Sequence, residues 1–526
     1  MLAKQVLAHG YPKVHDAKNI VYQDLIIDGK YLNLRKKTDA YVGHGWAMYY
    51  VAALGVLWGE GCDDHYAQTA RLRIPFAVIG LMGLIVLAFS MLPLFGNAMQ
   101  KRLFLVFFAC LSLLSVSLVL HLREVRYYSL VVFLGACILG AYTNYRFTQK
   151  IKFPLYLVVV SIGMWLLFNS FVPAYFIFFA GIGLYEGIEL LNKRPWELRR
   201  VPPPKVALMD FLRGITPLAI SFILVAPLLI YFKTFTIARE TSRVMAPMAS
   251  CRENILRILW FFLTSEALAP ALILKICCWY VYCKSDFQCD KKMHTVLAVS
   301  NFLGLVFMVY LLILSMGMTM APVYTRYFII LQPILSVVIL LDGFVLFDAV
   351  TQTQARQWKT PPVVMAVFLI FAFYGFGRLK DLRGHVYELF HVVKGPLDYA
   401  IPFIKAHYKD PEKLIIATNY EEFSFMYYLN SKVIFGFGGN NLKEDLTMRP
   451  DVISHRKSWQ RIISGAPAGP IRLYLQRAPY SRVTFPVYDS LVNNIPELMY
   501  LQPHHLYQTR FSSREEEQAD LYLLQE

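Results

Sequence analysis

Long apolar segments constrain this chain more than any other feature of its sequence. A helix of about 17–25 apolar residues matches the hydrocarbon core of a bilayer. Hydrophobic residues make up 56% of the 526 residues and charged residues 17%, against about 45–50% and 25% in soluble proteins. The sequence therefore predicts an all-α, multi-pass membrane bundle, with spans at residues 73–94, 104–120, 128–143, 154–170, 171–191, 213–232, 263–283, 294–316, 327–348 and 361–377.

The regions on either side of these spans have a different character. Residues 1–72 are mixed and include "HGWAMYYVAALGVLWG" (44–59), which is shorter than the ~20 residues of a span and equally fits an interfacial helix. After residue 380, strand-like runs such as "KLIIAT" and "KVIFGF" alternate with helix-like stretches, a pattern typical of α/β structure. We expect a first loop with interfacial helices (1–72), a transmembrane domain (73–379) and a C-terminal α/β domain (380–526).

The loop charges predict the orientation. Alternate loops are rich in Lys and Arg, which favours the cytoplasmic side; they carry Lys101, Arg102, Arg146, Lys150, Lys152, Lys193, Arg194, Arg199, Arg200, Lys205, Lys291, Lys292, Arg356 and Lys359. The loop 233–258, on the other side, also contains four arginines. The majority places residues 1–72 and 380–526 outside the cytoplasm. The alternative is that 44–59 spans the membrane and the N-terminus is cytoplasmic.

The net charge of +16 does not indicate nucleic acid. The basic residues belong to loops of a membrane protein, where they also meet anionic lipids, and no basic soluble domain with interleaved aromatic residues is visible. Neither a cofactor nor a metal-ligand set is predicted. A divalent metal stays possible, but His504 and His505 have no carboxylate or cysteine at ligand spacing.

The loop "LHLREVRYYSL" (120–130) is the first candidate site. Two arginines three residues apart, Arg123 and Arg126, would share one helical face, and the guanidinium fork fits phosphate. Glu124 is a candidate acid or base, and Tyr127 and Tyr128 would line a cavity. The alternative is an interfacial belt, since Arg and Tyr commonly anchor helix ends; the spacing favours neither.

The second candidate site is "APVYTRYFIILQPIL" (321–335). Arg326 begins a span and is flanked by Tyr324 and Tyr327, so it is either a phosphate contact at the mouth of a cavity or an anchor. The N-terminal region adds His44 as a substrate contact and Asp16 as a candidate carboxylate. Their alternative is an ordinary solvated surface.

The order of several motifs resembles a known family. The motifs are "LAHGYPK", "HGWAMYYVAALGVLWGE", "ARLRIPFAVIGLMGLIVL", "REVRYYSL", "YTRYFIILQP", "NYEEFSFMYYLNSKVI" and "RPDVISHRKSW". They resemble the GT-C glycosyltransferases of the protein mannosyltransferase and lipid A glycosyltransferase type. The resemblance implies transfer of a sugar from a polyprenyl-phosphate carrier to a lipid, glycan or protein acceptor, on the periplasmic face of the bacterial inner membrane.

The same resemblance implies a catalytic acidic pair just after a first transmembrane helix. A carboxylate there takes the acceptor's proton while positive groups stabilise the departing phosphate. By register, the helix and its pair would precede "LAKQVLAHGYPK", so we expect this chain to lack them. Asp16 is then the nearest carboxylate, and Glu124 loosely matches an acidic residue of the second outer loop.

Two other functions compete with transfer. A lipid or sugar transporter would carry charged residues in mid-span or inverted repeats; the sequence shows no convincing repeat, and we expect its charges at the span ends. A truncated, inactive member of the family is the other alternative.

Overall fold

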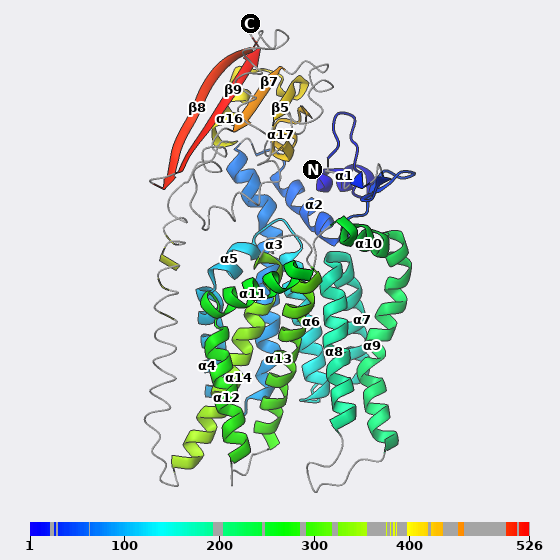
Figure 1. The fold of residues 1–526 in the computed structure, drawn as a ribbon, viewed down its shortest axis with the longest axis vertical. Helices are drawn as coiled ribbons and strands as arrows, with labels where there is room; N and C mark the ends of the chain where they lie inside the picture. The colour runs from blue at the N-terminus through cyan, green and yellow to red at the C-terminus, as the bar shows by residue number, and fades with distance from the viewer. Residues whose placement is uncertain are drawn as a thin grey trace. The chain divides into compact units, whose positions relative to one another are not determined.

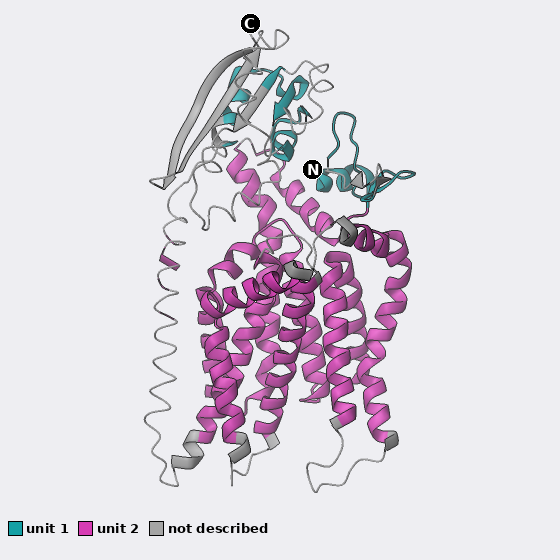
Figure 2. Cartoon of the chain, in the orientation of Figure 1, with its two compact units in different colours: residues 1–41, 388–526 teal, residues 42–387 magenta. Residues whose placement is uncertain are grey.

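The structure, a computed structural model, describes residues 1–21, 26–27, 30–62, 64–192, 204–244, 248–284, 291–317, 325–354, 375, 379, 382–383, 386, 397–418, 422–434, 451–456, 501–512 and 515–524. The chain forms two compact units (Figure 2). The membrane unit is Val42–Tyr387, and the two-segment unit joins Met1–Tyr41 to Glu388–Glu526. These divisions differ from the expected boundary at residue 72, because residues 42–72 group with the helix bundle.

The membrane unit is a helix bundle (Figure 1). Its elements are α2 (Ala47–Gly59), α3 (His65–Met91), η1 (Leu92–Leu94), α4 (Ala98–Leu114), α5 (Val116–Leu122), α6 (Tyr128–Arg146), α7 (Phe153–Ser170), α8 (Val172–Asn192), α9 (Pro204–Tyr231), α10 (Thr234–Val244), α11 (Met248–Thr264), α12 (Leu268–Lys284), α13 (Lys291–Gly317), η2 (Thr325–Phe328) and α14 (Leu331–Gln354). In the described part, seven helices are long and apolar enough to span a bilayer, or nine when two bent pairs count as one span each. The predicted spans from 73–94 to 327–348 fall on these helices, and 361–377 lies outside the described residues except for residue 375.

Local sequence explains where the helices begin and how closely they approach. The Asp64 carboxylate accepts hydrogen bonds from the backbone N–H groups of Tyr66 and Ala67, which satisfies donors at the start of α3. Further along, α3 packs against α6. A Cβ on Gly83 would lie 2.8 Å from the backbone of Phe133 on α6, so glycine permits this contact, as small residues commonly do between membrane helices.

Two helix pairs in the membrane unit are sharply bent. The break between α4 and α5 and the break between α11 and α12 each turn the chain by 81°. α5 then leads into the loop before α6, at the end of the bundle where α8 and α14 also begin (Figure 1). We call this the site end. The opposite end, where α4, α7 and α13 begin, carries Lys101, Arg102, Arg146, Lys150, Lys152 and Lys292.

The two-segment unit is built from both ends of the chain. Its elements are α1 (Leu2–His9), β1 (Ile26–Ile27), β2 (Lys30–Tyr31), β3 (Leu34–Arg35), β4 (Ala40–Tyr41), α16 (Leu397–His407), η3 (Pro411–Lys413), β5 (Ile415–Thr418), α17 (Glu422–Leu429), β6 (Lys432–Ile434), β7 (Val452–Arg456), β8 (Leu501–Ser512) and β9 (Glu515–Leu524). The last five strands form one sheet in the order β6-β5-β7-β9-β8. β5 is parallel to β6 and β7, whereas β9 is antiparallel to β7 and β8.

Asn19 joins the two segments of this unit. Its side-chain amide donates to the Ser431 carbonyl oxygen at 2.9 Å, and its oxygen accepts from the Val433 N–H at 2.7 Å. Nearby, Lys4 Nζ donates to the Tyr427 carbonyl oxygen at 3.0 Å. Asn19 is buried, so no solvent replaces these bonds.

Replacing Asn19 by leucine should therefore loosen the unit. The change leaves a buried N–H and a buried carbonyl unsatisfied, at about 1–3 kcal/mol for each group. Tryptic cleavage after Lys409 and Lys413 should become at least several-fold faster. Lys18→Ala is the matched control, because Lys18 donates to the same region from an exposed position; equal cleavage of both variants would contradict the assignment.

Candidate functional site

A short loop between α5 and α6, together with the first residue of α6, presents five of the ten predicted site residues. Helix α5 ends at Leu122, and residues 123–127 form a turn in which the Arg126 N–H donates to the Glu124 carbonyl oxygen at 2.7 Å. His121 Nδ1 lies 2.6 Å from Glu124 Oε1, which folds the turn back on the helix end. The prediction that Arg123 and Arg126 share a helical face is therefore wrong. We call residues 121–128 the arginine loop.

Aromatic rings bring three distant segments together beside the arginine loop. Tyr127 stacks on Phe171 with ring centroids 4.4 Å apart and planes 7° apart. Tyr327, on η2, stacks against both rings at 6.3 Å and 6.0 Å. Tyr128 meets Tyr127 edge-on at 4.9 Å, and His44 meets the same ring at 6.1 Å. We define the aromatic cluster as His44, Tyr127, Tyr128, Phe171 and Tyr327. All of these except Phe171 were predicted as site residues, from three separate regions of the sequence.

Charged groups act on Glu124, which lies in the arginine loop beside this cluster. Burial alone would raise the pKa of Glu124, but the hydrogen bond and charge of His121, together with the guanidinium groups of Arg126 and Arg326, lower it on balance. The Arg326 guanidinium lies 5.8 Å above the Tyr327 ring, within the range of a cation–π contact. An ionised carboxylate therefore sits between basic groups from the arginine loop and from η2.

Tyr127 contributes a neutral hydroxyl group. Burial, followed by the neighbouring hydroxyl groups of Tyr327 and Tyr128, raises the pKa of Tyr127 well above its usual value of 10. The phenol therefore stays protonated at physiological pH and keeps a hydrogen to donate. A protonated hydroxyl group near Arg126 suits an anionic ligand.

The other three predicted site residues, Arg123, Tyr324 and Asp16, are not part of the aromatic cluster. Arg123 lies in the arginine loop, partly exposed. Tyr324 lies outside the described residues. Asp16 belongs to the two-segment unit, where one carboxylate oxygen accepts from the backbone N–H groups of Lys18 and Asn19 at 2.7 Å and 2.5 Å. Those bonds give Asp16 a part in its own turn.

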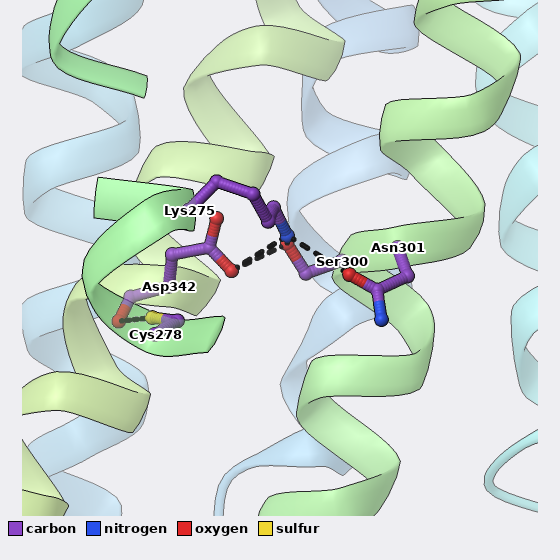
Figure 3. A network of polar contacts seen from close by, with 5 residues as sticks. All are labelled: Lys275, Cys278, Ser300, Asn301 and Asp342. Carbon is purple, nitrogen blue, oxygen red and sulfur yellow. Dashed lines mark hydrogen bonds and ion pairs between the residues drawn. The ribbon is translucent and has the colours of Figure 1, made fainter. Parts of the chain in front are cut away.

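An ion pair inside the bundle was missed by the sequence reasoning (Figure 3). Lys275 Nζ, on α12, lies 2.9 Å from Asp342 Oδ1 on α14, and Ser300 on α13 bonds to both at 2.6 Å and 2.7 Å. Asp342 is fully buried and lies eleven residues into α14, about 16 Å along the helix axis from its start. The expectation that charges gather at span ends is therefore wrong. A lone lysine in "ALILKICCW" and a lone aspartate in "VVILLDGFV" were the available signals.

A second buried carboxylate lies nearer the opposite end. Glu186, on α8, accepts hydrogen bonds from the Tyr142 hydroxyl group at 2.5 Å and from Arg146 Nε at 3.1 Å, both on α6. A Cβ on Gly214 of α9 would lie 2.6 Å from the same carboxylate. These contacts tie three helices together far from the arginine loop. Among the described residues, no group of three or more His, Cys, Asp or Glu side chains is placed to hold a metal ion.

Comparison with known proteins gives a likeness to solved structures at low sequence identity. No protein-family model matches the sequence, and no curated protein is similar enough to count as a relative. The chain resembles ArnT. That solved structure, from Cupriavidus metallidurans and bound to undecaprenyl phosphate, has a TM-score of 0.49 and 14% sequence identity, and the match covers 98% of this chain and 92% of that one. At this identity no residue role passes from that protein to this chain.

Proposed function

We propose that the site end of the membrane unit binds the phosphate of a polyprenyl-phosphate sugar and transfers the sugar to a lipid, glycan or protein acceptor. The observation that carries the proposal is that the aromatic cluster brings the arginine loop and η2 together at one end of a transmembrane bundle, where Arg126 and Arg326 both act electrostatically on Glu124. The two guanidinium groups exceed the single carboxylate of Glu124 in charge, so the electrostatics of the site end favour an anion. The exposed apolar faces of the spans suit a polyprenyl tail.

The residues present fit the chemistry of such a transfer. The acceptor oxygen forms a bond to the anomeric carbon as the bond from that carbon to the phosphate oxygen breaks, and the polyprenyl phosphate leaves with its electron pair. Arg126 and Arg326 would stabilise the charge that develops on the leaving phosphate. Glu124 would orient the acceptor hydroxyl group and receive its proton. Because its pKa is lowered, Glu124 is ionised but a weak base, so proton transfer would follow bond cleavage.

The proposal includes an orientation. The opposite end of the bundle carries Lys101, Arg102, Lys150, Lys152 and Lys292, and such residues favour the cytoplasmic side. The site end would then face the periplasm of a bacterial inner membrane. A membrane-impermeant thiol reagent applied to intact cells should label a cysteine placed at Val125, and labelling only after lysis would overturn this orientation.

Glu124→Gln tests the carboxylate separately from phosphate binding. The amide removes a negative charge from beside Arg126 and Arg326, so polyprenyl phosphate should bind as well as before or more tightly. Transfer should fall by about 10²–10⁴-fold, the usual contribution of a proton-transferring group. Binding in nanodiscs and transfer from radiolabelled polyprenyl-phosphate sugars to membrane lipid and protein fractions are the measurements. Undiminished transfer would remove Glu124 from the reaction.

A transporter is the second candidate, and the Lys275–Asp342 pair favours it. Ionisable residues at mid-bilayer depth commonly mark a transport path. Purified protein in liposomes separates the two functions, since a transporter moves labelled polyprenyl-phosphate sugar across the bilayer without forming a glycosylated product. An inactive family member would bind polyprenyl phosphate and do neither.

A further inference from the structure

The two bends of the bundle meet at one buried carboxylate. Ser115 lies between α4 and α5, and Glu266 lies between α11 and α12. The Ser115 hydroxyl group donates to Glu266 at 3.2 Å, instead of capping the helix that begins beside it. Glu266 and Ser115 are 3% and 7% exposed, so both side chains are shielded from solvent.

A third element reaches the same carboxylate. Gln332, the second residue of α14, donates from Nε2 to Glu266 Oε1 at 2.9 Å and is 3% exposed. The cavity around these three side chains holds about 10 Å³, roughly one water-sized probe. The contacts are therefore direct, and there is little room for the partners to rearrange.

The positions of the two donors connect Glu266 to the candidate site. Ser115 precedes the seven-residue helix α5, which leads without interruption into the arginine loop. Gln332 follows η2, which carries Arg326 and Tyr327, and its N–H donates to the Ile329 carbonyl oxygen at 3.2 Å. Glu266 thus accepts hydrogen bonds from the segment before one arginine and from the segment after the other.

We propose that Glu266 is a positioning residue, which holds the arginine loop and η2 in register through Ser115 and Gln332. Its catalytic consequence rests on the proposed function, but the positioning itself does not. Buried hydrogen bonds to a carboxylate are strong and directional, and each helix end at a bend leaves backbone groups without intrahelical partners. Without the carboxylate, the two segments lose the group that they share.

Hydrogen–deuterium exchange of the full chain in nanodiscs tests the positioning without any substrate. In Glu266→Ala, amides of residues 115–128 and 325–332 should exchange at least about tenfold faster, and amides of α7 and α9 should not change. Glu266→Gln keeps one acceptor oxygen and should restore most of the protection. Ser336→Ala is the matched control, because Ser336 lines the same cavity but donates to the Gln332 carbonyl oxygen; it should behave as the parent.

The hydrogen bonds from Ser115 and from Gln332 to Glu266 can also be removed one at a time, in case the Glu266→Ala variant does not fold. Ser115→Ala should release mainly residues 116–128, and Gln332→Ala mainly residues 325–332. Unchanged exchange in both segments, or a uniform increase across the bundle, would overturn the positioning role.

Binding of polyprenyl phosphate gives the functional readout. Where the parent binds it, Glu266→Ala should raise Kd at least about tenfold and Glu266→Gln should recover most of the affinity. If exchange became faster in residues 115–128 and 325–332 while the affinity for polyprenyl phosphate stayed the same, the positioning by Glu266 would not serve phosphate binding. A parent that binds no polyprenyl phosphate, with both segments released in Glu266→Ala, would sink the proposed function and leave the positioning intact.

Discussion

Replacing Arg326 by alanine should abolish sugar transfer while the protein stays folded. The change removes one of two guanidinium groups beside Glu124. Losing one donor that stabilises developing charge costs about 10²–10³-fold in rate, and a lost charge-assisted hydrogen bond costs about 1.5–3 kcal/mol in affinity. Arg326→Lys keeps the charge without the planar fork and should be intermediate.

The measurement uses purified protein in nanodiscs, with polyprenyl-phosphate binding, transfer and thermal unfolding recorded on the same samples. Arg252→Ala is the control, because Arg252 is an exposed arginine of α11 outside the aromatic cluster and the arginine loop. Full transfer by folded Arg326→Ala would sink the assignment of Arg326. Equal losses in both arginine variants would indicate a general effect of surface charge instead.

Replacing Lys275 alone should strongly destabilise the bundle. Lys275→Met leaves the fully buried Asp342 carboxylate without its cation, and an uncompensated buried charge costs about 3–5 kcal/mol. The double variant Lys275→Met, Asp342→Leu removes both charges and should recover most of that loss, because the desolvation of both ions disappears with them. Unfolding in nanodiscs or in graded detergent measures the free energy of unfolding of each variant.

The comparison also separates structure from transport. Lys101→Met, at the end of α4 away from the ion pair, controls for the loss of a lysine. If the double variant were no more stable than the single one, the pair would not be the source of the loss. A stable double variant that transfers sugar but has lost movement of labelled carrier across liposomes would assign the pair to transport.

Hydropathy predicted where the helices lie but not how they bend. The span predicted at 104–120 is a bent pair, and its break falls at Ser115 inside "LSLLSVSLVL". Every residue around the break is apolar or small, so the average hydropathy is the same for a straight helix and for a corner. At the break, Ser115 donates to Glu266, 151 positions away, and no local sequence pattern indicates that contact.

The candidate site was partly predictable, because side chains in alternate loops reach the same end of a bundle. That rule correctly brings Arg126, Tyr127, Arg326 and Tyr327 together. The rule does not predict Phe171, because its side chain has no polar group that would suggest a site. Phe171 joins the stack from the junction between α7 and α8. Asp16 was singled out as the nearest carboxylate, although the turn "DAKN" already suggested an aspartate that bonds to its own backbone.

The hydrogen bonds of Lys4 and Asn19 constrain the threading of the chain through the bilayer. Both residues bond to backbone groups between Tyr427 and Val433, and two hydrogen-bonded partners lie on one face of a membrane. The intervening chain must therefore cross an even number of times. In the described part of the chain, the helices long and apolar enough to span a bilayer number seven, or nine when each bent pair counts as one span, and both numbers are odd. The span that hydropathy predicts at residues 361–377 would make the number even.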